Sequence, residues 1–308
     1  MKHFFLTVTL LLSVLVTTGS AQNEAINKAL EQFDAKQYEQ AAQTFKQVIA
    51  QSPEFYQGHF NLGLCYYNLS QYDQAISSFQ KSVSIKPDYV RANYWLGNAL
   101  YSQKRYDEAV VWYQKTIQFE PNNANAHYKM GLVYQDTKKY SEAEKSLKKA
   151  IDFKPGEASY KVELGNVYVN LKLYPSAIVI FNEAIQISPN SENAQLGLGN
   201  AYYNNDKWAE SIPYYKKAAE LLPTWVTAHL YLADAYYKTK QYAIAITEYE
   251  TVIRLDNKRG DGYYGMGLTY VAQGNTPKAQ GVLVTIEKLD PSKAELLRTA
   301  ISNMKVEL

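Results

Sequence analysis

Residues 90–123 read VRANYWLGNALYSQKRYDEAVVWYQKTIQFEPNN, and these 34 residues set the pattern for almost the whole chain. Proline recurs at the same step, at Pro53, Pro87, Pro121, Pro155, Pro189, Pro223 and Pro291, with Asn257 in the remaining slot. A second slot keeps a small residue, at Gly63, Gly97, Gly131, Gly165, Gly199 and Gly267, with Ala29 and Ala233 completing it. A fixed period of this length is typical of a repeat array, so the sequence predicts eight similar units.

If each unit is numbered so that the proline falls at position 32, the units span 22–55, 56–89, 90–123, 124–157, 158–191, 192–225, 226–259 and 260–293. Apolar or small residues recur at positions 4, 7, 8 and 11, and again at 20, 24 and 27. Spacings of three and four mark one face of a helix, so each unit is predicted to hold two helices, A and B. A small residue at position 20 is expected to let helix B approach the glycine of helix A, and proline is expected to end helix B.

The same register continues beyond Pro291. It places Leu297, Ala300, Ile301 and Met304 on one face of a further helix. A terminal unit of a repeat array has one neighbour missing and needs a cover for its apolar side. We therefore expect residues 294–308 to form a C-terminal capping helix.

These motifs, which recur in phase over residues 22–293, resemble those of the tetratricopeptide repeat (TPR) family. The terminal units depart from the family pattern at Lys28 (position 7) and Thr276 (position 17, usually a large ring). The resemblance implies an all-α fold, a right-handed superhelical solenoid of tandem helix-turn-helix repeats. It also implies a non-catalytic protein–protein interaction scaffold, in which positions 2, 5, 6, 9, 12 and 13 of helix A line a concave groove.

Polar and aromatic residues occupy several of those groove positions. Position 9 carries Asn98, Asn166, Asn200 and Asp234, position 12 carries Tyr67, Tyr101, Tyr203 and Tyr237, and position 5 carries Tyr94 and Tyr128 among others. An amide side chain both donates and accepts hydrogen bonds, which suits an extended peptide backbone, and tyrosines supply apolar walls. These ten residues are the candidate site for a protein or peptide ligand. Asparagine and tyrosine are also common at these positions in the family, so stacking and solvation are an alternative explanation.

The first 21 residues have the layout of a secretory signal. A lysine is followed by an apolar stretch from Phe4 to Val16 and then by small residues up to Ala21. An uncleaved anchor is the alternative, but about 13 apolar residues fall short of the roughly 20 that span a bilayer. We expect cleavage after Ala21, export to a bacterial periplasm or to the outside, and no direct membrane insertion afterwards. The single cysteine, Cys65, excludes an intrachain disulfide.

Charge and composition favour neither nucleic acid nor enzymatic chemistry. The formal net charge is +2, which is too small for an electrostatic footprint on nucleic acid. Beyond the signal segment the histidines are His59, His127 and His229, all at position 4 of repeats that are two or more units apart. The glycines near Gly260 lack the lysine of a phosphate-binding loop. We expect no catalysis, no metal and no cofactor.

Three hypotheses for function follow from the sequence. In the first, the chain is an exported scaffold that holds a protein or peptide segment in the concave groove. In the second, it is a structural component of a cell-envelope complex and packs through its convex face or its ends. In the third, which rests only on the aromatic residues of the groove, it is an enzyme or a transport accessory that acts on polysaccharide.

Overall fold

The computed structural model describes residues 20–306, and within that range the chain is all helical, with no strand. The helices that correspond to helix A are α1 (Ser20–Asp34), α3 (Tyr56–Asn68), α5 (Val90–Ser102), α7 (Ala124–Asp136), α9 (Ala158–Asn170), α11 (Glu192–Asn204), α13 (Val226–Lys238) and α15 (Gly260–Ala272). Those that correspond to helix B are α2 (Tyr38–Gln51), α4 (Tyr72–Ile85), α6 (Tyr106–Phe119), α8 (Tyr140–Phe153), α10 (Tyr174–Ile187), α12 (Trp208–Leu221), α14 (Tyr242–Leu255) and α16 (Thr276–Leu289). Helix α17 (Pro291–Val306) ends the described part. The all-α fold predicted from the sequence is confirmed.

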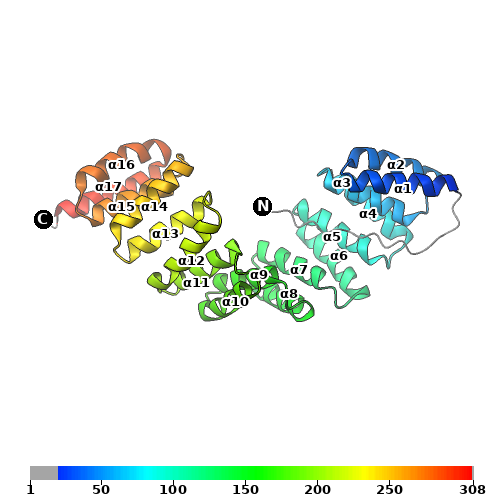
Figure 1. The fold of residues 1–308 in the computed structure, drawn as a ribbon, viewed down its shortest axis with the longest axis horizontal. Coiled ribbons are helices and arrows are strands. Elements are labelled where there is room, and N and C mark those ends of the chain that lie inside the picture. Colours follow the sequence, from blue (N-terminus) through cyan, green and yellow to red (C-terminus); the bar gives the residue numbers. More distant parts are fainter. Residues whose placement is uncertain (1–19, 307–308) are drawn as a thin grey trace. The chain divides into compact units, whose positions relative to one another are not determined.

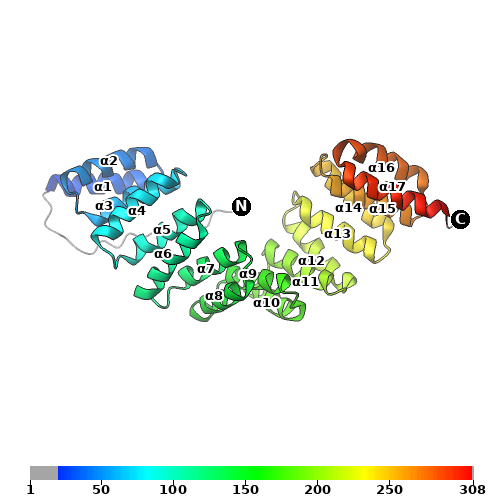
Figure 2. The ribbon, with the colours of Figure 1, turned by 180° about the vertical axis from the view of Figure 1, so that it is seen from behind.

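The chain divides into two compact units, Met1–Pro121 and Asn122–Leu308. The first contains α1 to α6, blue to cyan in Figure 1, and the second contains α7 to α17, green to red. Within each unit every helix A packs against the helix B that follows it, and that helix B packs against the next helix A. The view from behind shows the same order of neighbours within each unit (Figure 2). Each unit is therefore a stack of helix pairs, as expected for a solenoid.

The helix boundaries repeat with the sequence. From α3 onward each helix A covers positions 1 to 13 of a predicted repeat, and each helix B covers positions 17 to 30. Helix B therefore ends before the proline at position 32, as predicted, because proline cannot donate the next helical hydrogen bond. Helix α1 begins two residues before the predicted start at Gln22, so Ser20 and Ala21 of the predicted signal belong to it. The rest of that segment lies outside the described residues.

Helix A ends in the same way in every described repeat. The residue at position 15 has a positive φ of 58° to 74°, in the left-handed region. In the third repeat Lys104 N donates to Tyr101 O at 2.8 Å, and Arg105 N donates to Leu100 O at 2.9 Å. This pair of bonds is the Schellman motif, which satisfies carbonyls that the helix end leaves without partners. The left-handed residues are Lys36, Ser70, Lys104, Lys138, Lys172, Asp206, Lys240 and Gly274.

The glycine at position 8 is in close contact with a side chain that the sequence analysis did not assign to it. A Cβ added to Gly97 would lie 2.6 Å from the ring of Tyr113, and one added to Gly165 would lie 2.6 Å from the ring of Phe181. Both rings are at position 24 of helix B. The position-24 contact adds to the close approach that the small residue at position 20 was expected to allow. The alanines at position 20 are fully buried, but the side chains nearest to the glycine come from one turn further along helix B.

Helix α17 covers the end of the second unit, where it packs against α15 and α16 (Figure 1). Leu297 and Ile301 are buried, as expected from the register, whereas the side chain of Met304 lies outside the described ones. The helix begins at Pro291, three residues earlier than predicted. Proline at a first helical position loses no hydrogen bond. Asp290 caps it, since its Oδ1 accepts from Lys293 N at 3.1 Å.

Candidate functional site

Side-chain contacts join successive A helices, at predicted groove positions except for Tyr160, which is at position 3. Tyr67 on α3 and Ser102 on α5 lie within hydrogen-bond distance, with their hydroxyl oxygens 3.3 Å apart. In the second unit, Tyr160 on α9 donates to Oδ1 of Asn125 on α7 at 2.6 Å. The surface of adjacent A helices is therefore continuous within each unit. Of the ten candidate residues, four lie in the first unit and six in the second, and all but Asn98 are partly exposed.

Asn98 is engaged inside the fold. Asn98 is only 5% exposed, and its Oδ1 accepts a hydrogen bond from the hydroxyl of Tyr113 at 2.9 Å. Burial raises the pKa of Tyr94 to about 12, and a hydrogen bond from Asn98 partly offsets that rise. Both ends of the Asn98 amide therefore have partners within the third repeat. Its immediate role is to satisfy two tyrosine hydroxyls.

The same pairing recurs in the second unit. The hydroxyl of Tyr215 donates to Oδ1 of Asn200 at 2.8 Å, and that of Tyr249 donates to Oδ1 of Asp234 at 2.6 Å. These tyrosines stand at position 24, as Tyr113 does, where the other five repeats have phenylalanine or leucine. This function of position 24 was not predicted from the sequence. The signal was present, since tyrosine at position 24 occurs only in repeats that carry an amide or a carboxylate at position 9.

Asn166 differs from the other three polar residues at position 9. Its partner position holds Phe181, whose ring has no donor. The Nδ2 of Asn166 instead donates to Oε2 of Glu163 at 3.2 Å. Gln135 on α7 directs its Nε2 to the same carboxylate oxygen, at 3.4 Å. The surface of α7 and α9 thus gathers two amides around one carboxylate.

Asp234 carries the carboxyl with the largest upward shift among the described groove residues. Burial raises its pKa to about 6, and the hydrogen bond from Tyr249 and the charge of Lys238 only partly oppose that rise. Burial also raises the pKa of Tyr203 to about 12 and that of Tyr237 above its usual value. These three residues lie on α11 and α13 and are partly buried there.

Several candidate tyrosines lie edge to face with other rings or stack on them. Tyr67 contacts Trp95 at a centroid distance of 5.1 Å, and Tyr128 stacks on Tyr160 at 4.6 Å. Tyr237 contacts Tyr242, which begins the next helix B, at 6.0 Å. Such pairs hold the rings in fixed orientations while leaving part of each exposed. Fixed rings favour recognition, because little side-chain entropy is lost when a ligand packs against them.

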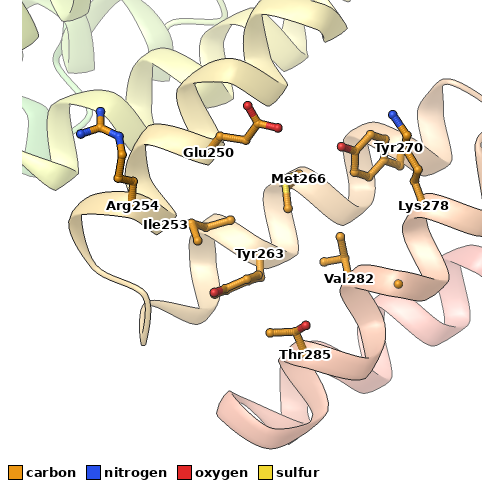
Figure 3. A pocket seen from close by; sticks show the side chains of 10 residues that line it. Glu250, Ile253, Arg254, Tyr263, Met266, Tyr270, Lys278, Val282 and Thr285 are labelled. Carbon is orange, nitrogen blue, oxygen red and sulfur yellow. The ribbon is translucent and has the colours of Figure 1, made fainter.

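A separate pocket, which sequence analysis did not identify, lies between α14, α15 and α16 (Figure 3). Its volume is about 580 Å³. It is lined by apolar and aromatic side chains, with charged groups among them; the lining residues are Glu250, Ile253, Arg254, Tyr263, Met266, Tyr270, Lys278, Gly281, Val282 and Thr285. Figure 3 shows Arg254 and Lys278 near its two ends. The small residue Gly281 at position 22 keeps one wall open, since no atom lies within 4 Å of an added Cβ there.

The histidines and the cysteine have structural surroundings. Nε2 of His59 donates to the carbonyl of Pro53 at 2.8 Å, and Nε2 of His229 donates to that of Pro223 at 3.1 Å, so position 4 fastens helix A to the preceding turn. Cys65 is fully buried, and burial raises its pKa to about 12. Among residues 20–306 no three histidine, cysteine or acidic side chains gather as metal ligands. None of the described helices is long and apolar enough to span a bilayer.

The outer face of α10 is unusually apolar. Leu173 just before the helix, Val179 within it and Ile187 at its end are 45%, 59% and 41% exposed. The only charged residue of this helix, Glu183, pairs with Lys161. The preceding helix B, α8, carries six charged residues over the same length. An exposed apolar helix face of this kind is typical of a surface that contacts another protein.

Family comparisons agree with the repeat pattern. One TPR repeat model matches residues 97–138, 165–206 and 233–274, and further tetratricopeptide repeat models match 26–90, 124–157 and 193–225. Together they cover well over half of the chain. No curated protein is close enough in sequence to count as a match.

Solved structures show the same fold. A tetratricopeptide repeat protein from Parabacteroides merdae is 17% identical, with a TM-score of 0.61 over 81% of this chain and 98% of that one. YrrB, described as a TPR protein with an unusual peptide-binding site, is 20% identical, with a TM-score of 0.53 over 61% of this chain and 97% of that one. MamA is 25% identical, with a TM-score of 0.51 over 52% of this chain and 94% of that one. The repeat period, the helix pairs and these matches together establish that the chain belongs to the tetratricopeptide repeat proteins.

Proposed function

We propose that this protein is a non-catalytic scaffold that binds a protein or peptide segment on the surface formed by its A helices. The observation that carries the proposal is the partly exposed row of Asn166, Tyr203 and Tyr237 on α9, α11 and α13. Binding of protein partners is the typical use of this repeat family, and YrrB, a peptide-binding relative in fold, is consistent with it. Such a surface can hold an extended chain through amides and pack its side chains against rings.

The contacts described above divide the ten candidate residues by the part we propose for each. Asn98, Asn200 and Asp234 hold the position-24 tyrosines, and the exposed remainder of Asn200 and Asp234 faces the ligand. In the first unit the main contact residues are Tyr67, Tyr94 and Tyr101, and in the second they are Tyr128, Asn166, Tyr203 and Tyr237. An alanine variant of Asn98 would therefore disturb the fold as well as the groove, and a groove variant is better placed at Asn166.

A matched pair of variants tests the proposal. Asn166→Lys places a long charged side chain on the A-helix surface, and Val179→Lys places the same side chain on the exposed outer face of α10. Both proteins are used for affinity capture from the cells that make the chain, and captured proteins are identified by mass spectrometry. Loss of a partner from the Asn166 variant alone supports the groove. Retention of every partner by that variant contradicts it.

The apolar face of α10 favours a second candidate function, in which the chain is a structural subunit of a cell-envelope assembly. Leu173, Val179 and Ile187 would be covered by an apolar surface of a neighbouring subunit. Loss of partners from the Val179 variant alone would support this candidate. A monodisperse monomer in light scattering, with no subunit co-purifying, would contradict it. A polysaccharide ligand remains the third hypothesis and is checked by a glycan-binding screen.

We also propose that the chain is exported, because residues 1–21 have the three-part layout of a secretory signal. Fusion of this segment to a reporter that is active only outside the cytoplasm tests the proposal. A silent reporter, with the fusion protein intact inside the cell, would contradict export. We further propose that the mature chain binds neither nucleic acid nor membrane, in keeping with its near-neutral charge.

A further inference from the structure

The fifth repeat departs from the pairing of positions 9 and 24 that the third, sixth and seventh repeats show. In the repeats of Asn98, Asn200 and Asp234, the polar side chain at position 9 accepts a tyrosine hydroxyl. In the fifth repeat the partner is Phe181, so Oδ1 of Asn166 receives no hydroxyl from position 24. Asn166 is partly exposed. Its oxygen is therefore an acceptor that the helix pair does not use.

Glu163 stands one turn before Asn166 on α9, and its carboxylate is held from two sides. Nδ2 of Asn166 and Nε2 of Gln135 both donate to Oε2, at 3.2 and 3.4 Å. These two donors orient the carboxylate and leave Oε1 for another partner. None of the salt bridges formed within residues 20–306 includes Glu163. Its negative charge is thus oriented but not paired with a cation of the described chain.

Gln135 acts on this carboxylate as a donor, from α7. Its Oε1 is buried and has no hydrogen-bond partner within the described part of the chain. A buried acceptor without a donor destabilises a structure, and a ligand on the surface does not reach this atom. Gln135, Glu163 and Asn166, which we call the α7–α9 subsite, thus leave two acceptors for a ligand, Oε1 of Glu163 and Oδ1 of Asn166.

The charge of the two helices favours a cation as the ligand. On α7, Lys129 and Asp136 carry opposite charges, and burial lowers the pKa of Lys129. On α9, Lys161 pairs with Glu183 of α10 at 2.5 Å, which leaves Glu163 as the remaining charge. Ammonium and guanidinium groups carry several N–H donors and no acceptor. They match a subsite that offers acceptors and one negative charge.

We propose that the α7–α9 subsite binds a lysine or arginine side chain of the peptide that occupies the A-helix surface. The inference rests on the proposed function, and it adds the class of residue that the ligand must contain and the place where that residue is held. Charge-assisted hydrogen bonds to a half-buried carboxylate are stronger than neutral ones. Glu163 therefore contributes affinity and selects for a basic side chain.

The test selects peptides from a phage-displayed random library on the full chain and measures the Kd of the enriched peptides by fluorescence anisotropy. Each peptide is compared with a copy in which its basic residue is replaced by norleucine. The proteins are the natural chain, Glu163→Gln and the control Glu210→Gln, whose residue is exposed on α12. Circular dichroism verifies that both variants retain the helical fold. The natural chain and Glu163→Gln, each measured with the basic and the norleucine peptide, form a double-mutant cycle. This cycle gives the interaction free energy between Glu163 and the basic residue of the peptide.

The expected result is a selected set rich in lysine or arginine, with binding weakened about tenfold or more by Glu163→Gln and unchanged by Glu210→Gln. The norleucine peptide should bind the natural chain and Glu163→Gln equally. Selected peptides without a basic residue, or with one that is insensitive to Glu163→Gln, would overturn the inference and leave the proposed function standing. Failure of the natural chain to select any peptide would overturn the proposed function itself.

Discussion

The hydroxyl of Tyr113 donates a hydrogen bond to Oδ1 of Asn98 at 2.9 Å, between helices A and B of one repeat and away from solvent. A buried hydroxyl and a buried amide oxygen each need a partner, and here they supply one another. The second repeat has Leu64 and Phe79 at the same two positions, so its helix pair needs neither group. The contact between positions 9 and 24 is thus a hydrogen-bonded polar pair in one repeat and an apolar pair in another.

Replacing Tyr113 by phenylalanine should lower the free energy of unfolding by about 1–3 kcal/mol, because Oδ1 of Asn98 would stay buried without a donor. The double variant Asn98→Leu with Tyr113→Phe recreates the pair of the second repeat. It should recover much of the loss. Urea unfolding followed by circular dichroism measures both. Equal losses in the single and double variants would show that the hydrogen bond is not the cause.

Gly97→Ala should lower the free energy of unfolding by about 1–3 kcal/mol, because the added methyl would lie 2.6 Å from the ring of Tyr113. The control is Gly156→Ala, in the turn after α8, where no atom lies within 4 Å of the added carbon. This control should change the unfolding midpoint little. A Gly97 variant as stable as the natural chain would mean that the ring can move aside.

Gly274→Ala should destabilise the eighth repeat by about 1 kcal/mol, because the residue has a φ of 74° in the turn after α15. The opposite sign is expected for Gly281→Ala, in an exposed part of α16. An alanine there meets no neighbour and favours the helix by about 0.5–1 kcal/mol. Hydrogen exchange of the amides of α15 and α16 measures the local change. Effects of the same sign in the two variants would contradict the conformational explanation.

Stability should fall as pH rises between about 4 and 6, because the pKa of Asp234 is raised to about 6 in the folded chain from 3.8. The folded state binds the proton more tightly than the unfolded state, so this contribution is complete below the lower value and lost above the higher one. Asp234→Asn retains an acceptor for Tyr249, as Asn200 does for Tyr215.

Asp234→Asn should remove this fall in stability between pH 4 and 6. At neutral pH its free energy of unfolding should exceed that of the natural chain by about 1–2 kcal/mol, after allowance for the partial exposure of the carboxyl. Urea unfolding of both proteins at several pH values measures the difference. A difference that does not change with pH would show that Asp234 is not the titrating group.

Much of the fold could be predicted from the sequence because its signals are local. Apolar residues at steps of three and four define the helix faces, and proline ends each helix B through chemistry confined to its own ring. Two features escaped prediction, the first of which recurs in every described repeat and the second in several. One is the left-handed residue at position 15, where lysine gives no sign of its φ. The other is the contact of the ring at position 24 with the glycine at position 8.

The sequence predicted which positions form the candidate site. It did not predict which of these side chains are engaged within the fold and which are left for a ligand. Asn98 and Asn166 occupy the same place in their repeats, and the sequence therefore assigned them the same function. Whether their oxygens bind a ligand depends on the facing residue of another helix, which is Tyr113 for the first and Phe181 for the second. The sequence alone determined the period, the helix pairs and the family. Only the tertiary structure decided which polar groups are engaged internally, because hydrogen bonds between helices depend on distances that the order of residues does not contain.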